Sequence, residues 1–188
     1  MSVRARRAAL VISCVGGAVG CHHHAKPAVP ASDTTSVTVF NAPDDSLIGV
    51  VSVTGTSFEQ RIVLHTGKSS RALILGRDDS AAIAQVGGAE VVAHGVNTPA
   101  AFSVRWFVVR SVDGAPVVDG VLERREGHLV LRTMKGLVAL GNPPIALDSL
   151  AGSRVWIGGP LATGPNVYGI IAPAGTPAND RIRLRSEH

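Results

Sequence analysis

The side chains with the plainest chemistry lie together near the N-terminus, where the thiol of Cys21 is followed by the imidazoles of His22, His23 and His24. Short histidine tracts bind zinc, copper or nickel through neutral ring nitrogens. A structural metal site, however, needs about four ligands that a fold holds in place. This tract begins a segment rich in proline, alanine, serine and threonine, so we interpret residues 21–36 as a disordered tether. We therefore assign no metal or other cofactor and keep the three histidines only as metal candidates.

The residues before this tether have the order of a secretory signal peptide. Arg4, Arg6 and Arg7 precede an apolar run at residues 8–20. A basic start followed by ~7 to 15 apolar residues is typical of a secretory leader. A membrane-spanning helix needs about 20 apolar residues, and this run is shorter. We therefore predict that residues 1–20 are a cleaved signal peptide.

The stretch Ala18-Val19-Gly20-Cys21 resembles the lipobox of bacterial lipoproteins. The resemblance implies cleavage before Cys21, thioether attachment of a diacylglycerol to its thiol, and a membrane anchor that holds the protein in the periplasm or at the cell surface. Ala18 departs from the leucine usual at the first position. A rival site ends at Cys14, but its apolar segment would be shorter than the usual ~7 residues.

Cysteine usage agrees with a modified Cys21. Cleavage before this residue also removes Cys14, so the exported chain keeps a single thiol. An odd cysteine in an oxidising compartment is a liability unless something uses it, and acylation does so. A plain secretory signal with a chance cysteine at the cleavage site remains the alternative.

The positive charge of the chain is concentrated at its two ends. The chain has 18 basic and 14 acidic residues, and loss of the leader leaves 15 basic ones. Residues 174–188, predicted to be a flexible tail, end in the arginine-rich RIRLRSEH, which could touch anionic lipid headgroups. Binding of single-stranded nucleic acid needs a basic groove interleaved with aromatic side chains, and this chain has only seven aromatic residues. We therefore expect no nucleic-acid partner.

The segment between tether and tail has the pattern of short strands throughout. Ten runs, such as GVVSVT, RIVLHT and HLVLRT, are rich in valine, isoleucine and leucine and are bounded by glycine, proline, asparagine or aspartate. No stretch sustains a helical period for three turns. The predicted fold class is all-β.

Self-comparison indicates two copies of one unit. RIVLHTGKSSRALILG aligns with HLVLRTMKGLVALG, and QVGGAEVVAHG aligns with SLAGSRVWIGG at a spacing of 64 residues. Upstream, Gly49-Val50 matches Gly120-Val121. We predict a first unit at residues 37–113 and a second at 114–173, joined near Asp113–Pro116.

The pattern in each copy predicts three strands, a short apolar turn and two further strands. In the first copy, Asp79 or Ser80 would cap one helical turn whose Ile83 and Val86 point inward. This order resembles the OB fold, a five-stranded, partly open barrel, and the small OB-type modules of exported bacterial proteins. The resemblance covers residues 47–173 and implies two tandem five-stranded OB-like barrels. A single larger barrel or a β-sandwich would have a similar strand count, and both remain alternatives.

Alternation along the strands assigns the large aromatic residues to opposite faces. In FSVRWFVV, it places Trp106 on the core face and Phe107 on the other face. In SRVWIGG, Trp156 points away from its inward neighbours. We expect a contact between the two copies that includes Phe107, Val109, Val118 and Trp156.

Motifs for known enzyme classes are missing from the sequence. GKSS at residues 67–70 resembles the end of a P-loop, but Ile62 occupies the place of the required glycine. The strand acids Asp119 and Glu123 have no spacing that would make them a general acid and base. No catalytic residue is assigned, and the sequence leaves open whether the protein is an enzyme.

The sequence therefore favours a lipid-anchored extracytoplasmic binding or structural module whose partner is an envelope protein or glycan. One alternative is an unrecognised envelope hydrolase or metal-dependent enzyme. The other is a nucleic-acid-binding OB protein. Barrels of this kind carry unrelated functions, so fold class alone does not decide among the three.

Overall fold

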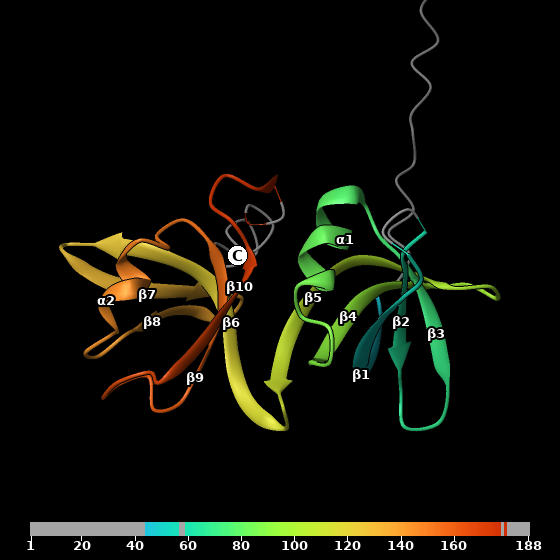
Figure 1. Ribbon diagram of the computed structural model, residues 1–188, viewed down its shortest axis with the longest axis horizontal. Coiled ribbons are helices and arrows are strands. Elements are labelled where there is room, and N and C mark those ends of the chain that lie inside the picture. The colour runs from blue at the N-terminus through green and yellow to red at the C-terminus, as the bar shows by residue number, and fades with distance from the viewer. Residues whose placement is uncertain (1–43, 57–58, 178, 180–188) are drawn as a thin grey trace, which may run out of the picture. The chain divides into compact units, whose positions relative to one another are not determined.

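The computed structural model describes residues 44–56, 59–177 and 179, and within this part the chain is all-β with two short helices (Figure 1). The predicted fold class is thus confirmed. Residues 37–43 of the predicted first copy lie outside the described residues. The elements, in chain order, are β1 (Asp45–Thr54), β2 (Arg61–His65), β3 (Ser70–Ile74), α1 (Arg77–Ala84), β4 (Glu90–Asn97), β5 (Phe102–Val112), β6 (Ala115–Arg125), β7 (His128–Thr133), β8 (Gly136–Ala139), α2 (Ile145–Asp148), β9 (Arg154–Gly158) and β10 (Val167–Ala172).

The first five strands pair in a closed ring. Strand β1 pairs with β2 and β4, β2 pairs with β3, and β5 pairs with both β3 and β4. Every pairing is antiparallel except that of β3 with β5. Helix α1 lies in sequence between β3 and β4. We call β1 to β5 with α1 the first unit.

Strands β6 to β10 repeat this order without closing the ring. Strand β6 pairs with β7 and β9, β7 pairs with β8, and β9 pairs with β10. No ladder joins β8 to β10 among the described residues. We call β6 to β10 with α2 the second unit. Strand β10 is therefore an edge strand.

The two units join through a two-residue hairpin at Asp113 and Gly114. Asp113 and Gly114 both have positive φ, at 50° and 76°, and Val112 pairs with Ala115 across them. A short Asp-Gly loop with left-handed backbone matches the right-handed twist of the strands that it connects. Beyond this turn the β5–β6 ladder ends at Ser111 and Pro116.

Residues that align in sequence occupy equivalent positions in the two units. The Val51 amide donates to the Ala89 carbonyl oxygen at 2.9 Å, and the Leu122 amide donates to that of Ser153 at 2.9 Å. Gly88 and Gly152 both have a φ of 87°, which favours glycine. Gly49 and Gly120 also correspond, because a Cβ at either one would collide with the neighbouring strand, at the carbonyl oxygen of His65 or of Arg132.

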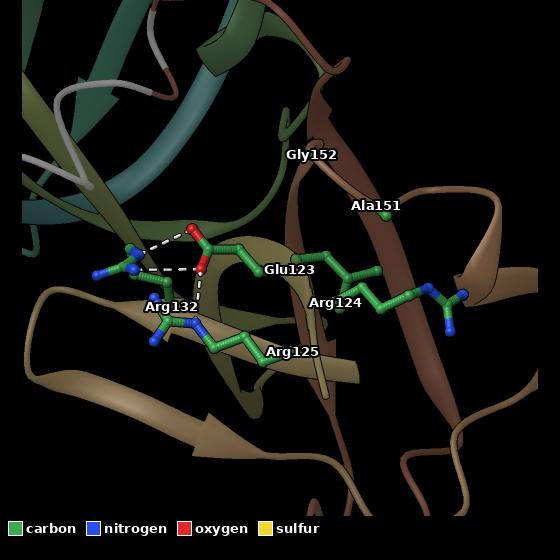
Figure 2. A pocket seen from close by; sticks show the side chains of 7 residues that line it. Glu123, Arg124, Arg125, Arg132, Ala151 and Gly152 are labelled. Carbon is green, nitrogen blue, oxygen red and sulfur yellow. Dashed lines mark hydrogen bonds and ion pairs between the residues drawn. The ribbon is translucent and has the colours of Figure 1, made fainter. Parts of the chain in front are cut away.

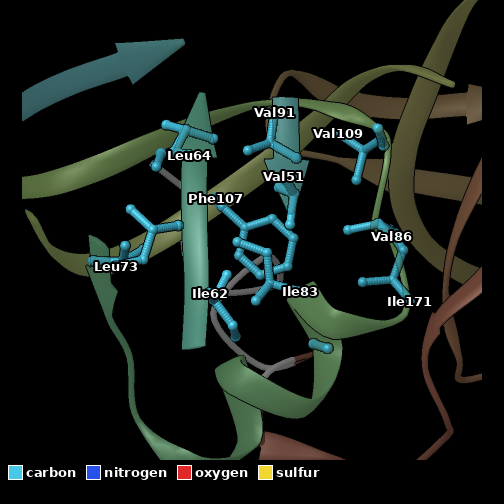
Figure 3. Close-up of a cluster of buried hydrophobic side chains, with 14 of the residues drawn as sticks. Val51, Ile62, Leu64, Leu73, Ile83, Val86, Val91, Phe107, Val109 and Ile171 are labelled. Atoms are coloured by element: carbon cyan, nitrogen blue, oxygen red, sulfur yellow. The ribbon is translucent and has the colours of Figure 1, made fainter. Parts of the chain in front are cut away.

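Each unit has its own cluster of buried side chains. The first cluster is formed by residues of β1 to β5 and α1, including Leu64, Ile83 and Phe107 (Figure 3). It also contains Ile171 and Ala172 from β10, and Val117 and Trp156 of the second unit pack against it. The second cluster is smaller and is formed by the second unit alone. Strands of the second unit thus complete the core of the first.

A β-bulge in β5 overturns the predicted alternation of its side chains. His94 pairs with Trp106, but Gly95 pairs with Val104, so Arg105 is an extra residue on β5. An extra residue moves the following side chains to the other face. Phe107 is therefore buried at 1% exposure, whereas Trp106, predicted to be core, is only partly buried and stacks on the His94 ring.

Two predicted details at segment ends are also wrong. Helix α1 spans two turns and begins after Gly76 without a side-chain cap, so neither Asp79 nor Ser80 is its N-cap. Ile83 and Val86 do point inward, as predicted. The boundary of the tail at residue 174 is too early, because Asn179 is buried and its amide donates to the Gly152 and Pro173 carbonyl oxygens at 3.0 and 2.9 Å.

Candidate functional site

An open pocket of about 670 Å³ on the second unit has a lining dominated by charged side chains (Figure 2). Its polar lining is Glu123, Arg124, Arg125 and Arg132. Leu122 and Gly152 contribute the apolar and backbone part. The lining thus has three guanidinium groups and one carboxylate, which makes it positively charged.

Two neighbouring strands position these groups. Glu123 and Arg125 are two residues apart on β6, so they project to the same face of the sheet. Arg132 projects from β7, and its Nε and Nη2 donate to the two carboxylate oxygens of Glu123 at 2.8 and 3.2 Å. The Nε of Arg125 donates to Oε2 of the same carboxylate at 3.3 Å. Glu123 therefore holds two arginines side by side, as Figure 2 shows.

Arg124 projects to the other side of β6 and has its own acidic partner. Its Nη2 donates to Oδ1 of Asp148 at 2.7 Å, and both side chains are about half exposed. Arg125 is also about half exposed, whereas Arg132 and Glu123 expose only 12% and 16% of their side chains. The pocket thus combines one shielded ion pair with two arginines that reach solvent.

Arg132 is the main cause of a lowered pKa at Glu123. The hydrogen bond from Arg132 lowers the pKa of Glu123 below its ordinary value of 4.5, and Arg125 acts in the same direction against the opposing effect of burial. A lowered folded-state pKa means that the carboxylate stabilises the fold above the unfolded pKa. This contribution is lost as the pH falls through the folded pKa.

We expect Glu123→Gln to destabilise the protein at neutral pH and to have a diminishing effect in acid, because protonated Glu123 resembles glutamine. Urea unfolding of both proteins, stepped from about pH 7 to about pH 3, measures this difference. In an Arg132→Gln background the pH-dependent difference should become smaller. A difference that stays constant across the range would contradict the assigned ion pair.

The first unit carries no counterpart of this charged cluster. Given the equivalence of Val51 with Leu122 and of Gly88 with Gly152, the residues at the matching positions are Ser52, Val53, Thr54, His65, Gly87 and Gly88. The same backbone thus forms with uncharged side chains and one histidine. The fold itself does not require the arginines of the second unit.

A buried ion pair lies where the two units meet. Nε and Nη2 of Arg154 donate to the two carboxylate oxygens of Asp119 at 2.9 and 2.6 Å. The same carboxylate accepts the Val109 amide at 2.9 Å, and Arg154 donates to the Phe107 carbonyl oxygen at 2.6 Å. The guanidinium carbon also lies 4.4 Å from the centroid of the Phe107 ring. The pair therefore satisfies backbone groups of β5 beyond the end of the β5–β6 ladder.

The structure gives each acid singled out in the sequence its own arginine instead of pairing the two. Asp119 is buried with Arg154, and Glu123 is held by Arg132. Sequence reasoning missed both arginines. A signal was present for Arg154. The alignment matches Asp119 with Ile48 and Arg154 with Glu90, so the charges on this sheet face differ between the two copies.

The other predicted site residues fall into two groups. Cys21, His22, His23 and His24 lie outside the residues that the structure describes. Trp156 is partly buried, packs against the first cluster and covers Gly169 of β10. Phe107 lies inside the first cluster, where its backbone and ring contact Arg154 from the second unit.

The histidines within the described residues do not converge. His65 contacts Ser70, His94 stacks on Trp106, and His128 is exposed at the start of β7. The part of the chain that the structure describes contains no group of three histidine, cysteine or acidic side chains placed to hold a metal ion. Among the same residues, no helix has the length and apolar character needed to cross a membrane.

No family model, curated protein or solved structure matches this chain.

Proposed function

We propose that this protein is a lipid-anchored extracytoplasmic binding module that recognises an acidic envelope polymer through the arginine-lined pocket of its second unit. The ligand class is a glycan or related polymer that bears carboxylate or phosphate groups. The observation that carries the proposal is the pocket itself, because three arginines line it and the equivalent positions of the first unit have no arginine.

The strand order supports the interpretation of each unit as an OB-like module. The first unit has the order β1-β2-β3-β5-β4, with β5 returning to β3 in parallel and a helix between the third and fourth strands. The second unit repeats the order with an open ring. OB folds commonly bind polymers across the barrel face and its loops.

The N-terminal sequence supports the anchor and the compartment. A basic start, an apolar run and the small residues before Cys21 are what export followed by acylation requires. An anchored protein lies next to the envelope polymers that such a pocket would recognise.

The chemistry of arginine supports an anionic ligand. Planar guanidinium groups donate two parallel hydrogen bonds to carboxylate or phosphate oxygens. Glu123 fixes Arg132 and Arg125 side by side, so little side-chain entropy is lost when a ligand binds. Arg124 and Arg125 each reach solvent, and Arg124 can exchange its exposed partner Asp148 for the ligand.

A charge-neutralising pair of substitutions tests the proposal. We expect Arg124→Gln with Arg125→Gln to weaken binding of the full chain to an acidic envelope polysaccharide by about tenfold or more, equivalent to about 1.4 kcal/mol. The double substitution leaves the Arg132–Glu123 pair in place. Titration by calorimetry at two salt concentrations measures the affinity and its electrostatic share.

The first unit provides a matched control for that experiment. Arg105 and Arg110 are also about half exposed, and each has an acidic partner, Asp44 at 2.7 Å and Glu90 at 3.9 Å. Arg105→Gln with Arg110→Gln removes the same charge from the other unit and should leave the affinity unchanged. Equal losses of affinity in the two double variants would mean that net charge, and not the pocket, determines binding. Tighter binding of single-stranded DNA than of the polysaccharide would favour the nucleic-acid alternative.

A further inference from the structure

The outward-facing side of β1 and β4 in the first unit corresponds to the side of β6 and β9 through which the second unit packs on the first. Val50 pairs with Glu90 on β1 and β4, as Val121 pairs with Arg154 on β6 and β9. One step along the sheet, Ile48 pairs with Val92 as Asp119 pairs with Trp156. We call Ile48, Val50 and Val92 the outer strip.

The two equivalent faces differ sharply in burial. In the second unit, Asp119, Val121 and Arg154 are 4%, 0% and 3% exposed, because the first unit covers them. In the first unit, Ile48 and Val50 are 47% and 42% exposed in the part of the chain that the structure describes. Large aliphatic side chains that share one sheet face at such exposure are typical of an interaction surface.

The covering element also has an exposed equivalent. Within the molecule, β5 covers the second unit's face, with the Phe107 carbonyl and the Val109 amide contacting Arg154 and Asp119. The equivalent strand of the second unit is β10, since Val155 pairs with Ile170 as Val91 pairs with Val109. Strand β10 is an edge strand, and its Val167 and Ile170 are 48% and 43% exposed.

We propose that the protein associates head to tail, with β10 of one molecule packing on the outer strip of a second molecule of this protein. The contact between molecules then has the same strand arrangement as the contact of β5 with the second unit, but with Ile48 and Glu90 in place of Asp119 and Arg154. The contact is heterologous, so an open assembly keeps one free β10 at one end and one free outer strip at the other, and it grows unless a ring closes.

The side chains at this contact fit an association that is reversible. At the outer strip, Ile48 stands where the internal contact has Asp119, and Glu90, which lies 3.9 Å from Arg110, stands where it has Arg154. The contact between molecules therefore depends on the exposed aliphatic side chains of Ile48 and Val50 instead of a buried ion pair. Exposed edge backbone on β10 adds hydrogen-bonding groups at the same place.

Sedimentation equilibrium of the mature chain with Cys21→Ser, in detergent-free buffer, tests the proposal. We expect the weight-average mass to rise with concentration. Ile48→Glu or Ile170→Glu should each abolish the rise. Ile145→Glu is the matched control, because Ile145 is 89% exposed on α2, which is part of neither surface, and the substitution should leave the rise unchanged.

Mixing the two single variants distinguishes the head-to-tail contact from a symmetric one. The Ile48→Glu molecule keeps an intact β10, and the Ile170→Glu molecule keeps an intact outer strip, so an equimolar mixture should form dimers and no larger species. A monomeric parent protein at all concentrations would overturn the proposal, as would a mixture that stays monomeric. If Ile48→Glu loses its circular dichroism signal, Val50→Lys replaces it in the same mixture.

Discussion

Replacement of Asp119 by alanine is expected to lower the free energy of unfolding by about 3 to 5 kcal/mol. Asp119 and Arg154 expose none and 3% of their side chains, so the substitution leaves a guanidinium in the interior without its carboxylate. The Val109 amide loses its acceptor at the same time. Arg154→Ala should cost a similar amount, because it leaves the carboxylate buried instead. Urea unfolding followed by tryptophan fluorescence measures both values.

The exposed pair of the pocket region is the control for this prediction. Arg124 and Asp148 are 2.7 Å apart, a distance close to that of the buried pair, but both are about half exposed. Asp148→Ala should therefore cost no more than about 1 kcal/mol. The double variant Asp119→Leu with Arg154→Met should recover much of the lost stability. If Asp119→Ala lowered the free energy of unfolding as little as Asp148→Ala does, the buried Asp119–Arg154 pair would not stabilise the junction of the two units.

The strands and the repeat were predictable because they depend on local pattern. Period-two alternation and flanking turn residues locate β2 and β7. The Asp113-Gly114 pair is itself the sequence typical of a left-handed two-residue turn. Gly88 and Gly152, which the alignment places at equivalent positions, share one backbone conformation.

The bulge at Arg105 and the cap of α1 were not predictable in the same way. Nothing in FSVRWFVV marks one residue as extra, because the bulge depends on how β5 pairs with β4. The helix starts after Gly76, whose backbone is extended, instead of at a polar cap. At the bulge, strand pairing overrides the local pattern.

The charged clusters depend on contacts between distant residues. Asp119 and Arg154 are 35 residues apart, and each resembles an ordinary solvent-facing strand charge in its own segment. Only the packing of the two units puts them in the interior. The arginines of the pocket likewise look like solvated residues around a hairpin until β7 brings Arg132 beside Glu123.

Loss of the lipid is the other change with a large expected effect, because membrane association should then be abolished completely. If Cys21 is the acylated residue, Cys21→Ser removes the only thiol that remains after cleavage of the leader. A single apolar leader of this length does not anchor the mature chain by itself. The variant should therefore leave the membrane fraction.

Metabolic labelling with a fatty-acid analogue, followed by membrane fractionation, tests whether Cys21 carries the lipid anchor. We expect the parent protein and Cys14→Ser to be labelled and found with membranes, and Cys21→Ser to be unlabelled and released. Labelling that persists in Cys21→Ser, or that is equal in the two variants, would contradict the assignment of this protein as an anchored envelope module.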